Sequence, residues 1–219
     1  MAELVYAEDL KSLTRKGVWV RFPPRAPKQF MQKHVFIVHG WNGAPDNCWI
    51  PWLKSELEKR NFVVETPAMP HPDEPTIEDW VGKLSEVVGE QDGQTFFVGH
   101  SIGCQTILRY VEQLEKPIGG IVCVAGFFRL LHLVTDEEKR IAQPWLETPL
   151  DDEKIKQNAG TVIAIFSDND PDVDLGDKDL FEQRLGAETI VEHDKGHFSD
   201  DAGVKELPSA LEAVLKMAG

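Results

Sequence analysis

The chain has 219 residues, 42% of them hydrophobic, and a formal net charge of −14. This length is enough for one well-buried domain. The negative charge disfavours nucleic acid and anionic membranes as partners, because lysine and arginine gather on no segment that would offset it. No apolar stretch reaches the roughly 18 residues of a membrane span, and the first residues lack the apolar block of a secretory signal. We therefore expect a cytoplasmic protein.

Residues 1–30 differ in composition from the rest. They hold six basic and three acidic residues, whereas the remaining 189 residues hold 17 basic and 34 acidic ones. The segment contains Phe22-Pro-Pro-Arg-Ala-Pro27 and lacks an amphipathic period. We expect Met31 to be the natural start and residues 1–30 to be a mis-assigned leader that resembles the translated end of a transfer-RNA gene. A real flexible arm is the alternative.

From Lys33 onward, short apolar runs alternate with longer amphipathic stretches, which is typical of a parallel sheet covered by helices. The expected strands are His34–Val38, Phe62–Glu65, Thr95–Val98, Gly120–Val124, Thr161–Phe166 and Thr189–Val191. The expected helices are Asn47–Arg60, Thr76–Gly89, Ile102–Leu114, Gly176–Leu185 and Gly203–Met217. The alternation breaks at about 127–158, where we expect a short helical lid. The predicted fold class is α/β: a single domain over residues 31–219, with about six mostly parallel strands and helices on both faces.

The strongest local pattern is a turn rich in glycine between an apolar strand and a helix. It reads Gly99-His-Ser-Ile-Gly103. Ser101 is expected on a tight strand-to-helix turn, where side chains at Gly99 and Gly103 would clash as the strand and helix approach. The turn aims the helix N-terminus and the N–H of Ile102 at the reacting oxygen. The pattern is that of a nucleophile elbow, so it predicts Ser101 as the nucleophile of an α/β-hydrolase fold.

A serine nucleophile needs a histidine base and a carboxylate that holds the base in the right tautomer. Both follow strands late in the chain, at the strand ends where α/β sheets bind ligands. Asp170 is the preferred acid, although spacing alone does not separate it from Asp168. His197 is the preferred base because it follows Gly196 in a loop able to swing the imidazole toward the serine. His193 continues the last strand and is the alternative.

A second turn with glycine follows the first strand, in Val35-Phe-Ile-Val-His-Gly-Trp-Asn-Gly43. The N–H of Trp41 is expected to form the oxyanion hole together with the N–H of Ile102. Asn42 is the neighbouring candidate for this donor. His100 adjoins the nucleophile in sequence, but its side chain should point away, so we interpret it as structural support.

Metal ions and cofactors are not indicated. The cysteines, Cys48, Cys104 and Cys123, fall in no metal-ligand or disulfide spacing, and we expect them to be small core residues. Alternate aspartates from Asp168 to Asp174 resemble the ligands of a calcium loop, but the required glycine and terminal glutamate are missing. The glycines form no phosphate-binding pattern at a helix start. The sequence therefore predicts neither a metal nor a cofactor.

Further motifs carry a resemblance to a known family: Trp49-Ile-Pro-Trp-Leu-Lys-Ser-Glu-Leu-Glu58, Pro67-Ala-Met-Pro-His-Pro-Asp-Glu-Pro75 and Trp80. From about Lys33 to the C-terminus, the chain resembles the small serine hydrolase family of retinoblastoma-binding protein 9 and bacterial YdeN. The resemblance implies a compact α/β-hydrolase with a short lid and a triad on Ser101, Asp170 and His197. The chain departs from the family's usual pattern just after the acid, at Asp170-Pro-Asp-Val-Asp174. No cysteine lies in an L-x-C-x-E motif, so the namesake's pocket-protein interaction is not carried over.

Together these patterns predict a serine hydrolase of the carboxylesterase type (EC 3.1.1). It would cleave small carboxylic esters, or less favourably thioesters and amides, through an acyl-enzyme. Its expected partner is a small acyl substrate, and no protein partner is identified. Phe127, Phe128 and Trp145 are candidates for the substrate pocket or for ordinary core. The alternative is a non-catalytic hydrolase-fold protein that acts as a binding or interaction module.

Overall fold

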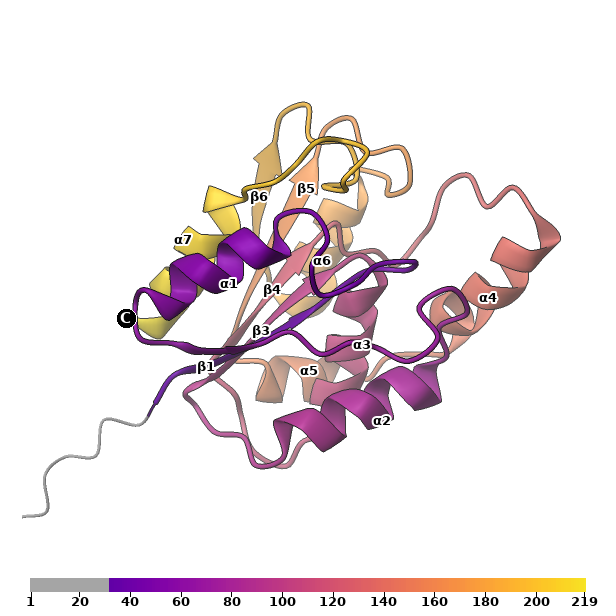
Figure 1. Ribbon diagram of the computed structural model, residues 1–219. Helices are drawn as coiled ribbons and strands as arrows, with labels where there is room; N and C mark the ends of the chain where they lie inside the picture. The colour runs from indigo at the N-terminus through magenta and orange to yellow at the C-terminus, as the bar shows by residue number, and fades with distance from the viewer. Residues whose placement is uncertain (1–31) are drawn as a thin grey trace, which may run out of the picture. The chain divides into compact units, whose positions relative to one another are not determined.

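The computed structural model describes residues 32–219, and the expected leader at 1–30 lies outside these residues. The described part is built on a parallel sheet of six strands in the order β2-β1-β3-β4-β5-β6 (Figure 1). The strands are β1 (His34–Val38), β2 (Val63–Glu65), β3 (Thr95–His100), β4 (Gly120–Val124), β5 (Thr161–Ser167) and β6 (Glu188–Glu192). The predicted α/β class and parallel sheet are confirmed.

Helices cover both faces of this sheet. They are α1 (Ile50–Glu58), α2 (Ile77–Val88), α3 (Ile102–Val111), α4 (Asp136–Glu147), α5 (Asp152–Asn158), α6 (Asp177–Leu185) and α7 (Pro208–Ala218). Helices α1 and α7 lie on one face, and α2, α3, α5 and α6 lie on the other (Figure 1). Within residues 32–219, none of the helices combines the length and the apolar character needed to cross a membrane.

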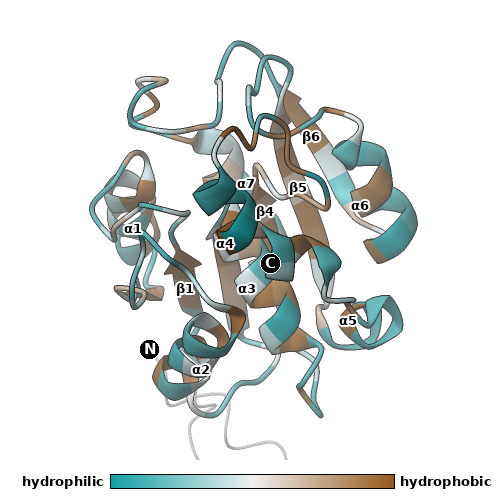
Figure 2. Cartoon of the chain, turned by 90° about the vertical axis from the view of Figure 1, so that its right-hand side faces the viewer, coloured by the Kyte–Doolittle hydropathy of each residue, from teal (hydrophilic) through white to brown (hydrophobic). Residues whose placement is uncertain are grey.

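The central strands are apolar because both of their faces are covered. Successive residues of a strand point to opposite faces, so β3 contributes side chains to two separate cores. Phe97 packs in the core under α2 and α3, whereas Phe96 and Val98 pack in the core under α1 and α7. Figure 2 shows the brown strands enclosed by helices with teal outer faces. The parallel direction brings the carboxyl ends of β1, β3, β5 and β6 to one edge, where the loops of the site lie.

Two expected helices begin later than the sequence pattern suggested. The first was expected from Asn47 and begins at Ile50, because the preceding residues form turns. The last was expected from Gly203 and begins at Pro208. Proline is well placed at the first helical position, since its missing N–H has no intrahelical acceptor there. The other three expected helices match α2, α3 and α6 within a few residues.

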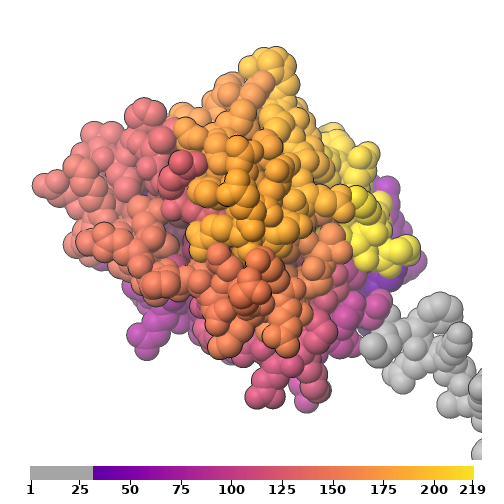
Figure 3. Space-filling view, turned by 180° about the vertical axis from the view of Figure 1, so that it is seen from behind, coloured from indigo at the N-terminus to yellow at the C-terminus, as the bar shows by residue number. Residues whose placement is uncertain are grey.

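The segment at 127–158 contains two helices with different surroundings. Helix α4 starts at a capping box, in which Thr135 Oγ1 accepts from the Glu138 N–H at 3.0 Å and the Glu138 carboxylate accepts from the Thr135 N–H at 2.7 Å. Its Trp145 is 2% exposed and packs edge-on against Trp80. Helix α5 packs against α3 and α6 and belongs to the helical layer. Seen from behind, the α4 region forms a lobe beside α6 (Figure 3).

Candidate active site

The turn between β3 and α3 has the geometry of a nucleophile elbow. Ser101 has φ 53° and ψ −119°, a conformation that residues with a side chain rarely adopt. A Cβ on Gly103 would lie 2.4 Å from the Val38 carbonyl oxygen, and one on Gly99 would lie 2.7 Å from the Cys104 nitrogen. The two glycines therefore permit the close approach of strand and helix, as the sequence predicted.

The preferred acid and base are in contact. His197 Nδ1 lies 3.0 Å and 2.9 Å from the two carboxylate oxygens of Asp170. The side chain of Asp170 is 2% exposed and that of His197 is 16% exposed. Asp170 Oδ1 also accepts from the N–H groups of Asp172, at 2.8 Å, and Val173, at 3.1 Å. The carboxylate is thus fixed on its own loop and holds Nδ1, which leaves Nε2 of the imidazole available.

Ser101 and His197 line one cavity of about 280 Å³ at the carboxyl edge of the sheet. The bond between Asp170 and His197 is already formed, whereas none joins Ser101 to His197 within residues 32–219. Catalytic hydrogen bonds are often long without substrate and tighten in the substrate complex. The structure therefore brings the predicted serine and histidine to the same cavity, with the aspartate directly behind the histidine.

His100 supports the loop that carries His197. Its Nε2 donates to the backbone carbonyl of His197 at 2.8 Å, and its ring packs edge-on against Trp49. Burial and the neighbouring His197 lower the pKa of His100 to about 3. The imidazole therefore stays neutral at ordinary pH. These contacts fit the structural role expected for His100. The expectation that its side chain points away from the nucleophile is wrong, because His100 lines the same cavity as Ser101.

The two candidate N–H donors in the turn after β1, those of Trp41 and Asn42, differ in their hydrogen bonds. The Asn42 N–H donates to the Pro72 carbonyl at 2.7 Å, so it is already engaged. No backbone carbonyl of residues 32–219 accepts from the Trp41 N–H. Ile102 is the first residue of α3, where an N–H has no intrahelical acceptor. The geometry thus favours Trp41 over Asn42 as the partner of Ile102.

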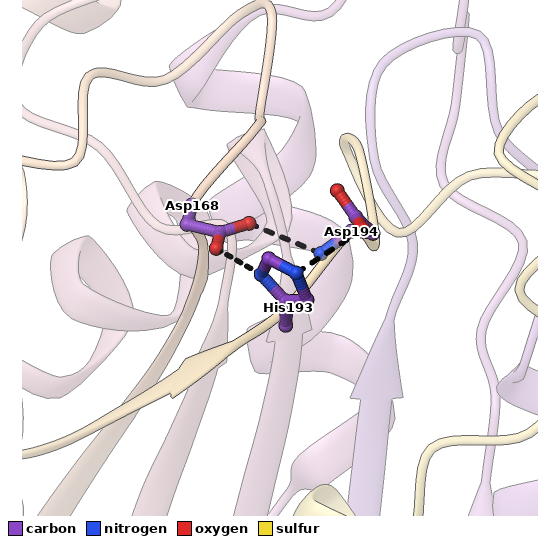
Figure 4. A group of neighbouring side chains, drawn as sticks. All are labelled: Asp168, His193 and Asp194. Carbon is purple, nitrogen blue, oxygen red and sulfur yellow. Dashed lines mark hydrogen bonds and ion pairs between the residues drawn. The ribbon is translucent and has the colours of Figure 1, made fainter.

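The alternative acid and base form a second pair outside this cavity. Asp168 Oδ2 binds His193 Nδ1, and Asp168 Oδ1 accepts from the Asp194 N–H at 3.0 Å. His193 Nε2 lies 3.2 Å from the Asp194 carboxylate. Figure 4 shows His193 between the two aspartates. These three residues could offer ligands to a cation, but the His193 side chain is 81% exposed and does not line the cavity of Ser101.

A group of hydrogen bonds between these pairs joins the loop that carries Asp170, the acid loop, to the loop that carries His197, the base loop. Asn169 Oδ1 accepts from the Gly196 N–H and from the Ser167 hydroxyl, each at 2.8 Å. Ser167 Oγ in turn accepts from the Lys195 N–H at 3.0 Å. Asn169 directly precedes Asp170, and Gly196 directly precedes the base. These bonds fix the two loops at the residues next to the acid and the base.

The wall of the cavity differs in part from the expected pocket. Phe127 lines the cavity, but Phe128 and Trp145 do not. Phe128 packs against Phe181 and Arg184 instead, with ring and guanidinium distances of 4.7 Å and 4.0 Å. The apolar wall is completed by three leucines that sequence reasoning did not select: Leu130, Leu131 and Leu133. Their position a few residues after Phe127, in the excursion at 127–158, was the available signal.

The chain is similar to known proteins over most of its length. The serine hydrolase family matches residues 35–216. YdeN of Bacillus subtilis (strain 168) is 35% identical over 187 residues, which cover 84% of this chain and 95% of YdeN. The solved structure of YdeN matches with a TM-score of 0.78 and 30% identity, over 85% of this chain and 98% of that one.

More distant relatives are similar to the chain in sequence or in fold. Serine hydrolase RBBP9 of Rattus norvegicus is 29% identical over 168 residues, which cover 75% of this chain and 86% of RBBP9. Est1E of Butyrivibrio proteoclasticus, solved with ferulic acid bound, has a TM-score of 0.67 at 15% identity, over 84% of this chain and 87% of that one, and shares the fold. The resemblance drawn from the sequence motifs is confirmed: this chain belongs to the serine hydrolase family.

Proposed function

We propose that the chain is a carboxylesterase-like enzyme (EC 3.1.1) that hydrolyses small carboxylic esters through an acyl-enzyme on Ser101. One observation carries the proposal: a strained serine and a histidine held by a buried carboxylate line the same cavity. A histidine oriented in this way can activate a serine hydroxyl that is otherwise a poor nucleophile.

The proposed reaction uses these groups in the following order. His197 Nε2 takes the proton of the Ser101 hydroxyl, and the serine oxygen attacks the acyl carbon. The resulting oxyanion accepts from the N–H groups of Trp41 and Ile102, and losing one such donor typically costs about 3–4 kcal/mol of transition-state stabilisation. His197 then donates its proton to the leaving oxygen as the ester bond breaks. A water molecule activated by His197 attacks the acyl-enzyme and releases the acid, while Asp170 keeps the imidazole oriented.

The cavity favours a small apolar acyl group. Its volume of about 280 Å³ is near the lower end for ligand pockets, and its wall includes Phe127 and the three leucines that follow it. The lining residues include Glu138 and Asp172 but no lysine or arginine. A thioester with a phosphate-bearing carrier would find no cation there to bind it. Esters are therefore favoured over such thioesters.

Labelling with a fluorophosphonate probe tests the proposal. The wild-type protein should be labelled, and Ser101→Ala and His197→Ala should not be, because the probe reacts only with an activated serine. His193→Ala is the matched control and should be labelled like the wild type. Circular dichroism of each variant checks that it is folded. A folded wild type that stays unlabelled would contradict the proposal and favour the binding-module alternative.

A further inference from the structure

A second cavity adjoins the one that contains Ser101. It has a volume of about 220 Å³. The two cavities share five lining residues: Gly40, Trp41, Asn42, His100 and Ser199. The turn that carries the expected oxyanion donor and the loop that carries His197 therefore form a common wall between them.

The two cavities differ in the side chains that line them, although each lining holds two carboxylates and no lysine or arginine. The cavity of Ser101 has an apolar wall made by Leu130, Leu131 and Leu133. The residues found only in the second cavity are mostly polar: His39, Gly43, Asn47, Cys48, Ile50, Asp200 and Asp201. Its lining holds two carboxylates and no lysine or arginine. An anionic ligand is therefore disfavoured there, and a cationic or hydroxyl-bearing one is favoured.

The two carboxylates differ in how far protein groups already engage them. Asp200 Oδ2 accepts from Asn47 Nδ2 at 3.0 Å and from the Cys48 N–H at 3.1 Å, and Oδ1 binds Lys205, which lies outside the lining. Lys205 and the Cys48 N–H hold the pKa of Asp200 below its ordinary range. Asp201 is exposed and has no ion pair within residues 32–219. Asp201 is thus the freer charge on this wall.

Cys48 does not provide a second nucleophile in this cavity. Burial and the charge of Asp200 raise the pKa of its thiol to about 11. A thiol with such a pKa is protonated at neutral pH and reacts poorly. The cavity is therefore better suited to bind a group than to react with one.

The reaction geometry tells which part of a substrate would lie in this cavity. The carbonyl carbon of an ester carries an acyl chain on one side and the alcohol group on the other. The apolar wall of the Ser101 cavity suits the acyl chain. The leaving oxygen must come within hydrogen-bond reach of His197 Nε2 to receive its proton. Ser199, two residues beyond that histidine, lines both cavities, and Asp200 follows it. The base loop thus leads from the leaving oxygen into the second cavity.

We propose that the second cavity binds the leaving group of the ester and selects leaving groups that are cationic or carry hydroxyls over apolar or anionic ones. This inference rests on the ester hydrolysis proposed above. The ester C–O bond breaks as the Ser101 Oγ–carbon bond forms, and His197 protonates the departing oxygen. The free alcohol then leaves through the second cavity, while the acyl group stays on the serine.

Four butyrate esters that differ only in the alcohol test the proposal: choline, glycerol, ethyl and carboxymethyl. The measured quantity is kcat/KM, because it reports acylation, the step that includes the leaving group. The choline and glycerol esters should react faster than the ethyl ester, and the anionic carboxymethyl ester should react slowest. The choline preference should decrease at high salt, because salt screens charges near the surface.

Asp201→Asn assigns the preference to this cavity. It should lower the ratio of choline ester to carboxymethyl ester by about threefold, as expected for removal of one exposed charge. Asp46→Asn is the matched control, because Asp46 is exposed in the turn before α1, outside the lining, and loses the same charge. That variant should keep the wild-type ratio.

The outcomes separate the two proposals. Equal rates for the four esters, or an equal change in Asp46→Asn and Asp201→Asn, would overturn the assignment of the second cavity while leaving the esterase function intact. Absence of both ester hydrolysis and fluorophosphonate labelling in folded wild type would overturn the esterase function and this inference with it.

Discussion

Two aspartate–histidine pairs join the same two loops, and only one of them lies beside the serine. In the pair Asp170–His197, the side chains are 2% and 16% exposed, and the imidazole lines the cavity of Ser101. In the pair Asp168–His193, they are 34% and 81% exposed, and neither residue lines that cavity. The same residue types make the same contact in both. Burial and position relative to the serine, rather than the contact itself, distinguish a candidate catalytic pair from a surface pair.

The difference between the pairs arises in the acid loop. Strand β5 ends at Ser167, and Asp168 and Asn169 form a turn. Alternate residues of a continuing strand would share a face, but a turn rotates the chain between them. Asp168 is therefore left on the outside with His193, while the side chain of Asp170 is buried. The following predictions test this contrast, from the largest expected effect to the smallest.

Removing each imidazole should give the largest contrast. His197→Ala should lower kcat for ester hydrolysis by about 10⁴- to 10⁶-fold, because the serine loses its base. His193→Ala should stay within about twofold of the wild type, since surface substitutions have small effects. Steady-state kinetics with p-nitrophenyl butyrate measures both. A comparable loss in the two variants would mean that the exposed pair takes part in the reaction.

Neutralising each carboxylate should give the next largest contrast. Asp170→Asn should lower kcat by about 10⁴-fold, because the amide favours the wrong tautomer of the base. Asp168→Asn should change kcat by less than about threefold, as an exposed ion pair contributes little. The same assay, with thermal unfolding to check the fold, measures both. If Asp168→Asn were the more damaging variant, the assignment of the acid would be wrong.

The hydrogen bonds between the loops should have a smaller, positional effect. Asn169→Ala removes the acceptor of the Gly196 N–H and the Ser167 hydroxyl. An unsatisfied group of this kind costs about 1–3 kcal/mol, and we expect kcat to decrease about tenfold with little change in KM. Asn169→Asp keeps the accepting oxygen and should recover most of the rate. Equal rates in both variants would show that this acceptor does not position the base.

The exposed pair should affect stability in a pH-dependent way. The Asp168 carboxylate, followed by Asp194, raises the pKa of His193 above its ordinary value. The protonated imidazole is then favoured by folding, so the stabilisation is complete below the unfolded pKa of about 6.5 and is lost as pH rises through the raised folded pKa. Urea unfolding of wild type and His193→Gln should therefore differ more at low pH than at high pH. A difference that grows with pH would contradict this sign.

Much of the fold follows from short-range sequence patterns. The apolar runs of β1, β3, β4 and β5 are buried on both faces, so their composition alone marks them as strands of a parallel sheet. The sequence pattern predicts a helical lid at about 127–158 but not helix α4 as a separate element, although Thr135 and Glu138 have capping-box spacing. Its apolar residues are spread among many charges, which hides the helical period. Packing of α5 against α3 and α6 depends on contacts distant in sequence.

The site was predictable where backbone geometry restricts residue type. Gly99 is required by its close approach to Cys104, and Gly103 by its close approach to the Val38 carbonyl. Both glycines stand at fixed positions around the serine, so the elbow could be recognised from the sequence. The choice between Asn42 and Trp41 depends on the Pro72 carbonyl, which is far along the chain and invisible to spacing. Trp145 is apolar in either environment, and only tertiary packing places it in the core rather than in the pocket wall. The catalytic roles themselves stay predictions.

The neutral ring of His100 has a consequence for which imidazole can hold a transferred proton. Its centroid lies 5.1 Å from that of His197, so two imidazoles stand side by side near the serine. Two basic neighbours could share or exchange an abstracted proton, which would delay its return to the departing alcohol. With its pKa lowered to about 3, His100 cannot hold that proton at neutral pH. In the proposed reaction, the proton taken from Ser101 would therefore stay on His197, and the neighbouring imidazole would not accept it.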